Sequence, residues 1–325
     1  MVSKFWTASM AAGITMLPFS GVLAQDYPSK EPVKIVMPFA PGGVGHGVTN
    51  LLAQLLSEEL ASEFYVETRP GAGGAIGHDY VSKQEPDGYT LLMGVISTTT
   101  MLPAMRSDLP WDPVDDFAPI THFASGSNVL VVPADSPYDT IDSLVEAGRD
   151  ANGNLTCGSS GPGTTLHLSC VLLNQVAGTN FVHVPYTGNA PAVVGLVGGE
   201  TSMMFATTDV VEFVNDGSAR ALAVSSSEQL PFLPDVPTVS ELGYPELTID
   251  SWYGLFAPEG TPEEIIQTLS DAVAAFREKD EWVDGLAQVR MRPAEVNGPE
   301  EFEAFVESEL ERWAPIVEAS GATAQ

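Results

Sequence analysis

The chain has 325 residues, of which 43 are acidic and 13 are basic, so its formal net charge is -30. This charge argues against nucleic acid as a partner, because affinity for nucleic acid comes largely from Lys and Arg. A hydrophobic share of 44% is ordinary for a globular protein and argues against disorder. The length suits one large domain or two of ordinary size. The acidic excess predicts a solvated surface, and recruitment of cations or a basic partner is the alternative.

Residues 1–24 have the pattern of a secretory signal peptide. Lys4 is their only charged residue, an apolar stretch runs through residues 5–23, and residues 22–24 precede a predicted cleavage before Gln25. A membrane anchor is the alternative, but glycine and proline weaken the stretch as a membrane span. We therefore expect an exported protein.

The two cysteines, Cys157 and Cys170, are 13 residues apart. Cys157 ends a predicted strand and Cys170 lies two turns into the next predicted helix. Export to an oxidising compartment permits a disulfide between them, which we predict and which would pin the helix beside the strand. Two buried thiols are the alternative reading, and two cysteines alone do not make a metal site.

The rest of the chain alternates short apolar runs with helical patterns. Strands are predicted at residues 33–37, 64–67 and 89–95, with helices at 48–60 and from 73 between them. A second series begins at residue 129, with strands at 129–132, 155–158, 181–184, 203–206 and 219–224. Its helices are predicted from Thr140, at 164–176 and at 190–197. Two further helices follow, one capped by Thr261 and one at 299–317. The alternation predicts an α/β fold with mostly parallel strands.

Charge is distributed unevenly along this pattern. Residues 35–57 carry no formal charge, and residues 151–208 carry only Glu200. Both stretches are rich in turn residues, and several of their loops follow predicted strands. Two of these loops, residues 38–43 and 157–164, combine glycine with a following helix start, which is a suitable arrangement for binding an anion. For residues 38–43, a tight turn that needs glycine is the alternative. Ligands of open α/β sheets bind outside the carboxyl ends of strands, so these loops predict a cleft between two domains.

Motifs for catalysis and metal binding are absent or incomplete. Neither Ser159 nor Ser160 stands in a Gly-x-Ser-x-Gly nucleophile elbow, and there is no P-loop or calcium loop. The histidines lack metal-ligand spacing. We therefore predict no enzyme, no metal and no cofactor. A secreted hydrolase that uses Ser160 with His167 or His183 remains the rival class.

Seven ordered motifs carry a resemblance to a known family. They are residues 36–43 (VMPFAPGG), 69–74 (RPGAGG), 86–92 (PDGYTLL), 158–161 with 167–168, 183–186 with 191–192, 233–239 (LPDVPTV), and 252–262 (WYGLFAPEGTP). The chain resembles the Bug-type (TctC-like) periplasmic solute-binding receptors of tripartite tricarboxylate transporters, over nearly all of the sequence after the signal peptide.

The resemblance implies a two-domain periplasmic-binding-protein (Venus flytrap) fold, each domain having a mostly parallel sheet flanked by helices. Residues 25–125 and 250–325 would form domain 1 and residues 126–249 domain 2, with the ligand in the cleft between them. The implied ligand is a small carboxylate: a di- or tricarboxylate, an acidic amino acid or an aromatic acid. The implied partners are membrane permease subunits, and we expect a periplasmic monomer. A sensor that presents its ligand to a signalling partner is a further alternative.

Candidate ligand-binding residues follow from the loops and the resemblance together. One wall of the cleft is predicted to contain Phe39, Ala40, Gly42, Gly43, His46, Ser97 and Thr98. The opposing wall is predicted to contain Ser159, Ser160, Gly161, Thr164, Tyr186, Thr207 and Asp209. Asp209 would repel an anion, so it suits a ligand with an amino or hydroxyl group, or a bridging water.

The chain departs from the family pattern at two of these motif positions. Family members commonly carry Asp and Arg where this sequence has His46 and Asn50. An imidazole there replaces a carboxylate with a side chain whose charge can change in the physiological pH range. The substitution predicts a different ligand class or pH-dependent binding; a change at the helix start with little effect is the alternative.

Overall fold

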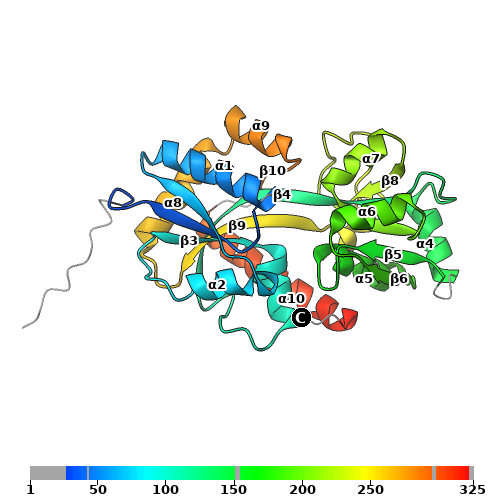
Figure 1. The fold of residues 1–325 in the computed structure, drawn as a ribbon, viewed down its shortest axis with the longest axis horizontal. Coiled ribbons are helices and arrows are strands. Elements are labelled where there is room, and N and C mark those ends of the chain that lie inside the picture. The colour runs from blue at the N-terminus through cyan, green and yellow to red at the C-terminus, as the bar shows by residue number, and fades with distance from the viewer. Residues whose placement is uncertain (1–26, 42–43, 151–153, 295–297, 322–325) are drawn as a thin grey trace, which may run out of the picture.

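Two lobes lie side by side in the computed structural model of the chain, which describes residues 27–41, 44–150, 154–294 and 298–321 (Figure 1). The predicted signal peptide, Gly42 and Gly43 lie outside the described residues. Two long antiparallel strands, β4 (Phe117–Pro133) and β9 (Asp250–Pro258), run between the lobes. The strand order is β2-β1-β3-β9-β4-β7-β5-β6, with β10 and β8 also pairing with β4.

The first lobe combines parallel and antiparallel strands. Strands β2 (Phe64–Thr68), β1 (Val33–Met37) and β3 (Thr90–Val95) are parallel, and β9, β4 and β10 (Arg292–Pro293) continue the sheet in antiparallel pairs. Its helices are α1 (Val44–Glu59), α2 (Ala75–Val81), α3 (Leu102–Met105), α8 (Glu263–Phe276) and α9 (Asp280–Gln288). The leucine spacing of α1 puts Leu52, Leu55 and Leu56 on one buried face, which packs into the core.

The second lobe has the same general plan. Strands β7 (Met203–Thr207), β5 (Thr156–Ser159) and β6 (Val182–Pro185) are parallel, while β8 (Ala219–Val224) and β7 pair antiparallel with β4. Its helices are α4 (Ile141–Asp150), α5 (Thr165–Ala177), α6 (Asn189–Val197) and α7 (Val211–Asn215). Thr140 caps α4 as predicted, since the Ser143 amide donates to its hydroxyl at 3.1 Å.

The C-terminal helix α10 (Pro299–Ser320) packs against both lobes. It contacts β4 and α3 in the first lobe and α5 in the second. Trp313 is fully buried, and its indole N–H donates to Glu309 at 3.0 Å. The guanidinium of Arg312 donates to the Thr248 carbonyl at 2.5 Å, beside the start of β9. One buried cluster therefore continues from the first lobe into the second beneath α10.

Two local predictions need correction. The strand predicted at residues 129–132 is the last part of β4, which begins at Phe117. Its earlier residues read as irregular because Thr121, His122 and Ser125 are buried polar side chains within a strand. Helix α8 begins at Glu263 with Pro262 as its N-cap, and the Thr261 hydroxyl donates to the Pro258 carbonyl instead of capping the helix.

Within the described residues, no helix has the length and apolar character needed to cross a membrane.

Candidate functional site

A cleft between the lobes consists of two adjoining hollows. The inner hollow has a volume of about 660 Å³ and the outer one about 530 Å³. Both volumes are within the size range of small-molecule binding sites. The hollows share six lining residues, which are Val44, His46, Asn128, Thr207, Ser251 and Tyr253. They therefore form one continuous site that takes residues from both lobes and from both crossing strands.

Three helices begin at the inner hollow. Val44, Thr165 and Asn189 are the first residues of α1, α5 and α6, and all three line the hollow. The first N–H groups of a helix have no partner within the helix, and the helix dipole is positive at that end. Three such ends around one hollow favour an anionic group inside it.

The loop between β5 and α5 is shaped by glycine. Gly161 and Gly163 adopt φ values of 131° and 75°, which favour glycine over residues with a side chain. The Thr164 hydroxyl accepts from the His167 amide at 3.3 Å and donates to the Gly161 carbonyl at 2.8 Å. This capping fixes the start of α5 and places Ser160 and Thr164 on the wall of the inner hollow.

The structure brings eight of the fourteen predicted ligand residues to the cleft. Seven line the inner hollow: Phe39, Ala40, His46, Ser97, Ser160, Thr164 and Thr207. Asp209 lines the outer hollow. Gly42 and Gly43 cannot be placed, because they lie outside the described residues.

Four predicted residues do not line either hollow. Thr98 is fully buried and donates to the Val95 carbonyl at 3.2 Å. Ser159 is fully buried below the loop, and Gly161 is buried with its carbonyl turned to Thr164. The Tyr186 hydroxyl donates to Glu200 at 2.9 Å. Each lies at the end of a strand or just after one, as expected, but its side chain or carbonyl bonds within the protein.

The crossing strands supply lining residues that sequence reasoning missed. Asn128 on β4 and Ser251 and Tyr253 on β9 line both hollows, and Asn189 lines the inner one. Burial raises the pKa of Tyr253 to about 12, so its hydroxyl stays protonated and can donate a hydrogen bond. No loop motif marked these strand residues, although Asn189 follows a predicted strand end.

Formal charge is sparse in the cleft. No Asp, Glu, Lys or Arg lines the inner hollow within the described part of the chain, and the outer hollow has Asp209 and Arg290. Asp209 accepts hydrogen bonds from Asn189, at 2.8 Å, and from the Thr207 hydroxyl. Arg290 forms an ion pair with Glu212 on α7, so it connects the two lobes at the outer hollow. The inner hollow therefore presents neutral donors and helix ends.

The imidazole of His46 lies beside Asn50 one turn further along α1. The Asn50 amide nitrogen is 3.2 Å from a ring nitrogen of His46 and donates to the His46 carbonyl at 2.7 Å. The two residues that depart from the family pattern thus contact each other, and His46 lines both hollows.

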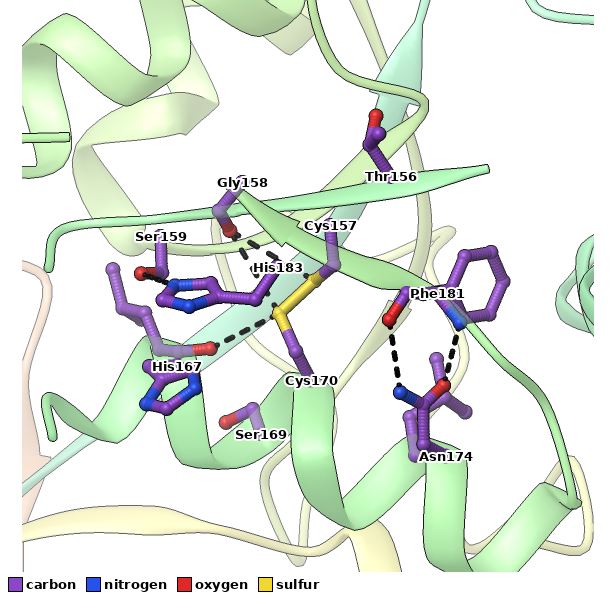
Figure 2. Close-up of a disulfide and its surroundings, with 12 residues drawn as sticks. Thr156, Cys157, Gly158, Ser159, His167, Ser169, Cys170, Asn174, Phe181 and His183 are labelled. Atoms are coloured by element: carbon purple, nitrogen blue, oxygen red, sulfur yellow. Dashed lines mark hydrogen bonds between the residues drawn. A yellow bond between two sulfur atoms is a disulfide. The ribbon is translucent and has the colours of Figure 1, made fainter. Parts of the chain in front are cut away.

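A disulfide and a histidine pair lie beside β5 and the start of α5 (Figure 2). Cys157 and Cys170 form a disulfide with their Cα atoms 6.2 Å apart, which ties β5 to α5. The rings of His167 and His183 stack at 3.8 Å, and His183 Nε2 is 2.6 Å from the Ser159 hydroxyl oxygen. Burial and the neighbouring His183 lower the pKa of His167 to about 4.

The Ser159 hydroxyl contacts His183 but is not an accessible nucleophile. Ser159 is fully buried, and its hydroxyl also contacts the Gly161 amide and carbonyl. The rival hypothesis named Ser160, which lines the cleft but makes no hydrogen bond to a histidine among the described residues. Nor does any group of three metal-ligating side chains occur in the described ranges. The Ser159–His183 pair therefore helps to hold the β5–α5 loop in place.

Comparison with known proteins identifies the family. The model of the tripartite tricarboxylate transporter family receptor matches residues 48–322. The chain belongs to this receptor family. The family consists of periplasmic solute receptors, so the resemblance read from the motifs is confirmed, as is the two-lobed periplasmic-binding-protein fold.

Three similar proteins illustrate this family of receptors. Protein BugT of Bordetella pertussis is 31% identical over 93% of this chain and 92% of its own. The structure of R. palustris Rpa4515 with adipate has a TM-score of 0.77 and 31% identity, covering 92% of this chain and 99% of that one. MatC from Rhodopseudomonas palustris with bound malate has a TM-score of 0.73 and 29% identity, with coverages of 89% and 99%.

Proposed function

We propose that this chain is a periplasmic receptor that closes on one small carboxylate and delivers it to the permease subunits of a tripartite transporter. The observation that carries the proposal is the meeting of three helix N-termini at an inner hollow that no described Asp, Glu, Lys or Arg lines. The adipate and malate bound by two structural neighbours support a carboxylate as the ligand. Export by the predicted signal peptide is part of the same proposal.

The ligand residues that we propose are those that line the cleft. Ser97, Ser160 and Thr164 would donate hydroxyl hydrogen bonds to the carboxylate, and the first N–H groups of α1 and α5 would add backbone donors. Asp209 in the outer hollow would accept from an amino or hydroxyl group of the ligand, or from a bridging water.

The hinge of the closing motion would lie where β4 and β9 cross between the lobes. Ser127 is the last β4 residue that pairs with β9, opposite Asp250, and Asn128 is the first that pairs with β7. We therefore keep domain boundaries close to residues 125/126 and 249/250. Helix α10 touches both lobes, so closure would also have to shift its contact with α5.

A panel of candidate ligands tests the receptor proposal. The purified chain is denatured and the released small molecules are identified by mass spectrometry. The folded chain is then heated with malate, adipate, aspartate and benzoate. Ligand at 100 times its dissociation constant stabilises a protein by about 2.7 kcal/mol, so a cognate carboxylate should raise the melting temperature clearly. If no small carboxylate raises it, the proposed ligand class is wrong.

Two further assays separate the alternative functions. Ester turnover that Ser160→Ala abolishes would support a hydrolase, whereas stoichiometric binding without turnover supports a receptor. Loss of carboxylate uptake on deletion of the gene supports transport, and uptake that persists while a ligand response is lost supports a sensor.

A further inference from the structure

Asn128 lies at the point where β4 passes from one sheet to the other. Its neighbour Ser127 pairs with Asp250 of β9 in the first lobe, and Asn128 itself pairs with Thr207 of β7 in the second lobe. The residue therefore stands at the floor of the cleft, on the segment that joins the lobes.

The backbone of Asn128 is held from both sides by Ser225. The Asn128 amide donates to the Ser225 hydroxyl oxygen at 3.0 Å, and the Asn128 carbonyl accepts from the Ser225 amide at 2.9 Å. The Ser225 hydroxyl also lies 3.0 Å from the Ile249 carbonyl, beside the start of β9. These bonds fix where the side chain of Asn128 begins, so its carboxamide has little freedom except rotation about its side-chain bonds.

The side-chain amide nitrogen of Asn128, unlike its backbone, makes no hydrogen bond within the described residues. Asn128 is 1% exposed, and its Nδ2 has no hydrogen-bond partner among the described residues. Buried side-chain amides are normally satisfied, because leaving a donor unpaired costs free energy. Asn128 also lines both hollows, so the group with the unmet donor stands at the cleft wall.

We propose that the Asn128 carboxamide binds the ligand, donating a hydrogen bond to an oxygen of the bound carboxylate at the hinge. Asn128 lines both hollows, and its amide nitrogen carries two hydrogens that no group among the described residues accepts. A ligand held there contacts the strand that joins the lobes as well as the two walls. This inference rests on the proposed receptor function and names a residue that the loop motifs did not mark.

Two variants and one control test the role of Asn128. Asn128→Leu removes the amide and keeps a side chain branched at the same carbon, and Asn128→Asp keeps the shape but replaces the donor with an acid. The control is Thr201→Val. Thr201 is also buried with an unpaired side-chain oxygen within the described chain, but it lines neither hollow.

Melting of the ligand-free proteins and calorimetric titration with malate and adipate give the two readouts. Asn128→Leu should weaken binding of whichever acid the wild type binds by about 10- to 100-fold, the loss expected for a hydrogen bond to a charged group. Its ligand-free melting temperature should stay the same or rise, because an unpaired buried amide has been removed. Asn128→Asp should bind at least as weakly, and Thr201→Val should bind like the wild type.

A purely structural role gives a different pattern. Asn128→Leu and Asn128→Asp affinities within twofold of the wild type would overturn the inference, as would a fall in ligand-free melting temperature that accounts for the lost affinity. If the wild type binds no carboxylate, the receptor proposal fails and this inference fails with it. That failure is recognised because it occurs in the wild type and not only in the variants.

Discussion

Breaking the Cys157–Cys170 disulfide should destabilise the second lobe by a predictable amount. The bond closes a loop between residues 13 apart in sequence, and both cysteines are buried in the core that β5 and α5 share. The entropy that such a cross-link removes from the unfolded chain corresponds to about 3 kcal/mol at 25 °C. The bond also anchors the helix whose first turn lines the cleft, so its loss should weaken ligand binding as well.

Urea unfolding followed by circular dichroism measures this effect. The free energy of unfolding of the wild type is compared with and without dithiothreitol, and the double variant Cys157→Ala/Cys170→Ala serves as the control. The sequence has only two cysteines, so the variant should not respond to the reductant. A wild-type difference below about 1 kcal/mol would refute the loop-entropy reasoning. An equal response in the variant would show that the reductant acts elsewhere.

Three further predictions concern the ion pair between the lobes, a buried histidine and the altered motif position. Glu212→Gln removes the ion pair with Arg290 and should weaken ligand binding by at most about fivefold at low salt. At high salt, where exposed charges are screened, the variant should bind like the wild type. The control Asp108→Asn breaks an ion pair within one loop and should leave affinity unchanged at both salt concentrations. Burial lowers the pKa of His78 to about 4, below its unfolded value near 6.5. The free energy of unfolding should therefore fall as the pH is lowered from 6.5 to 4, by up to about 1.4 kcal/mol per pH unit. A His78→Gln variant with an equally steep fall would contradict this prediction. His46→Asp puts a carboxylate against both hollows and should change the affinity for carboxylate ligands by more than about fivefold. Affinities that stay unchanged from pH 5 to 8 would show that His46 has only a structural role in the first turn of α1.

Sequence patterns predicted the repeating strands and helices of each lobe and missed most of the two strands that run between the lobes. Strand β1 and helix α5 follow clear apolar patterns, and the structure has them within a residue or so of the predicted bounds. Only the last part of β4 was predicted, because its earlier part carries buried polar side chains, and no strand was predicted at β9. A buried polar residue such as His122 is satisfied by distant partners, which local periodicity cannot reveal.

The candidate site was predictable where backbone direction decided it. Loops after parallel strands meet at one edge, so Phe39, Ser97 and Ser160 reached the cleft as expected. Side-chain direction decided the failure at Tyr186, whose hydroxyl turns to Glu200. Asn128 lines the cleft from β4, but the strand predicted there began one residue later, at 129. Contacts between residues far apart in sequence set both outcomes.

Calorimetric titration with a carboxylate and its neutral amide tests the central claim most directly. The carboxylate that raises the melting temperature most is titrated beside the amide of the same carbon skeleton. Charge-assisted hydrogen bonds are roughly twice as strong as neutral ones, so the acid should bind one to one and about tenfold or more tighter than the amide. Equal binding of the amide, or turnover of the acid without a stable complex, would contradict a receptor that holds its ligand's negative charge at three helix ends.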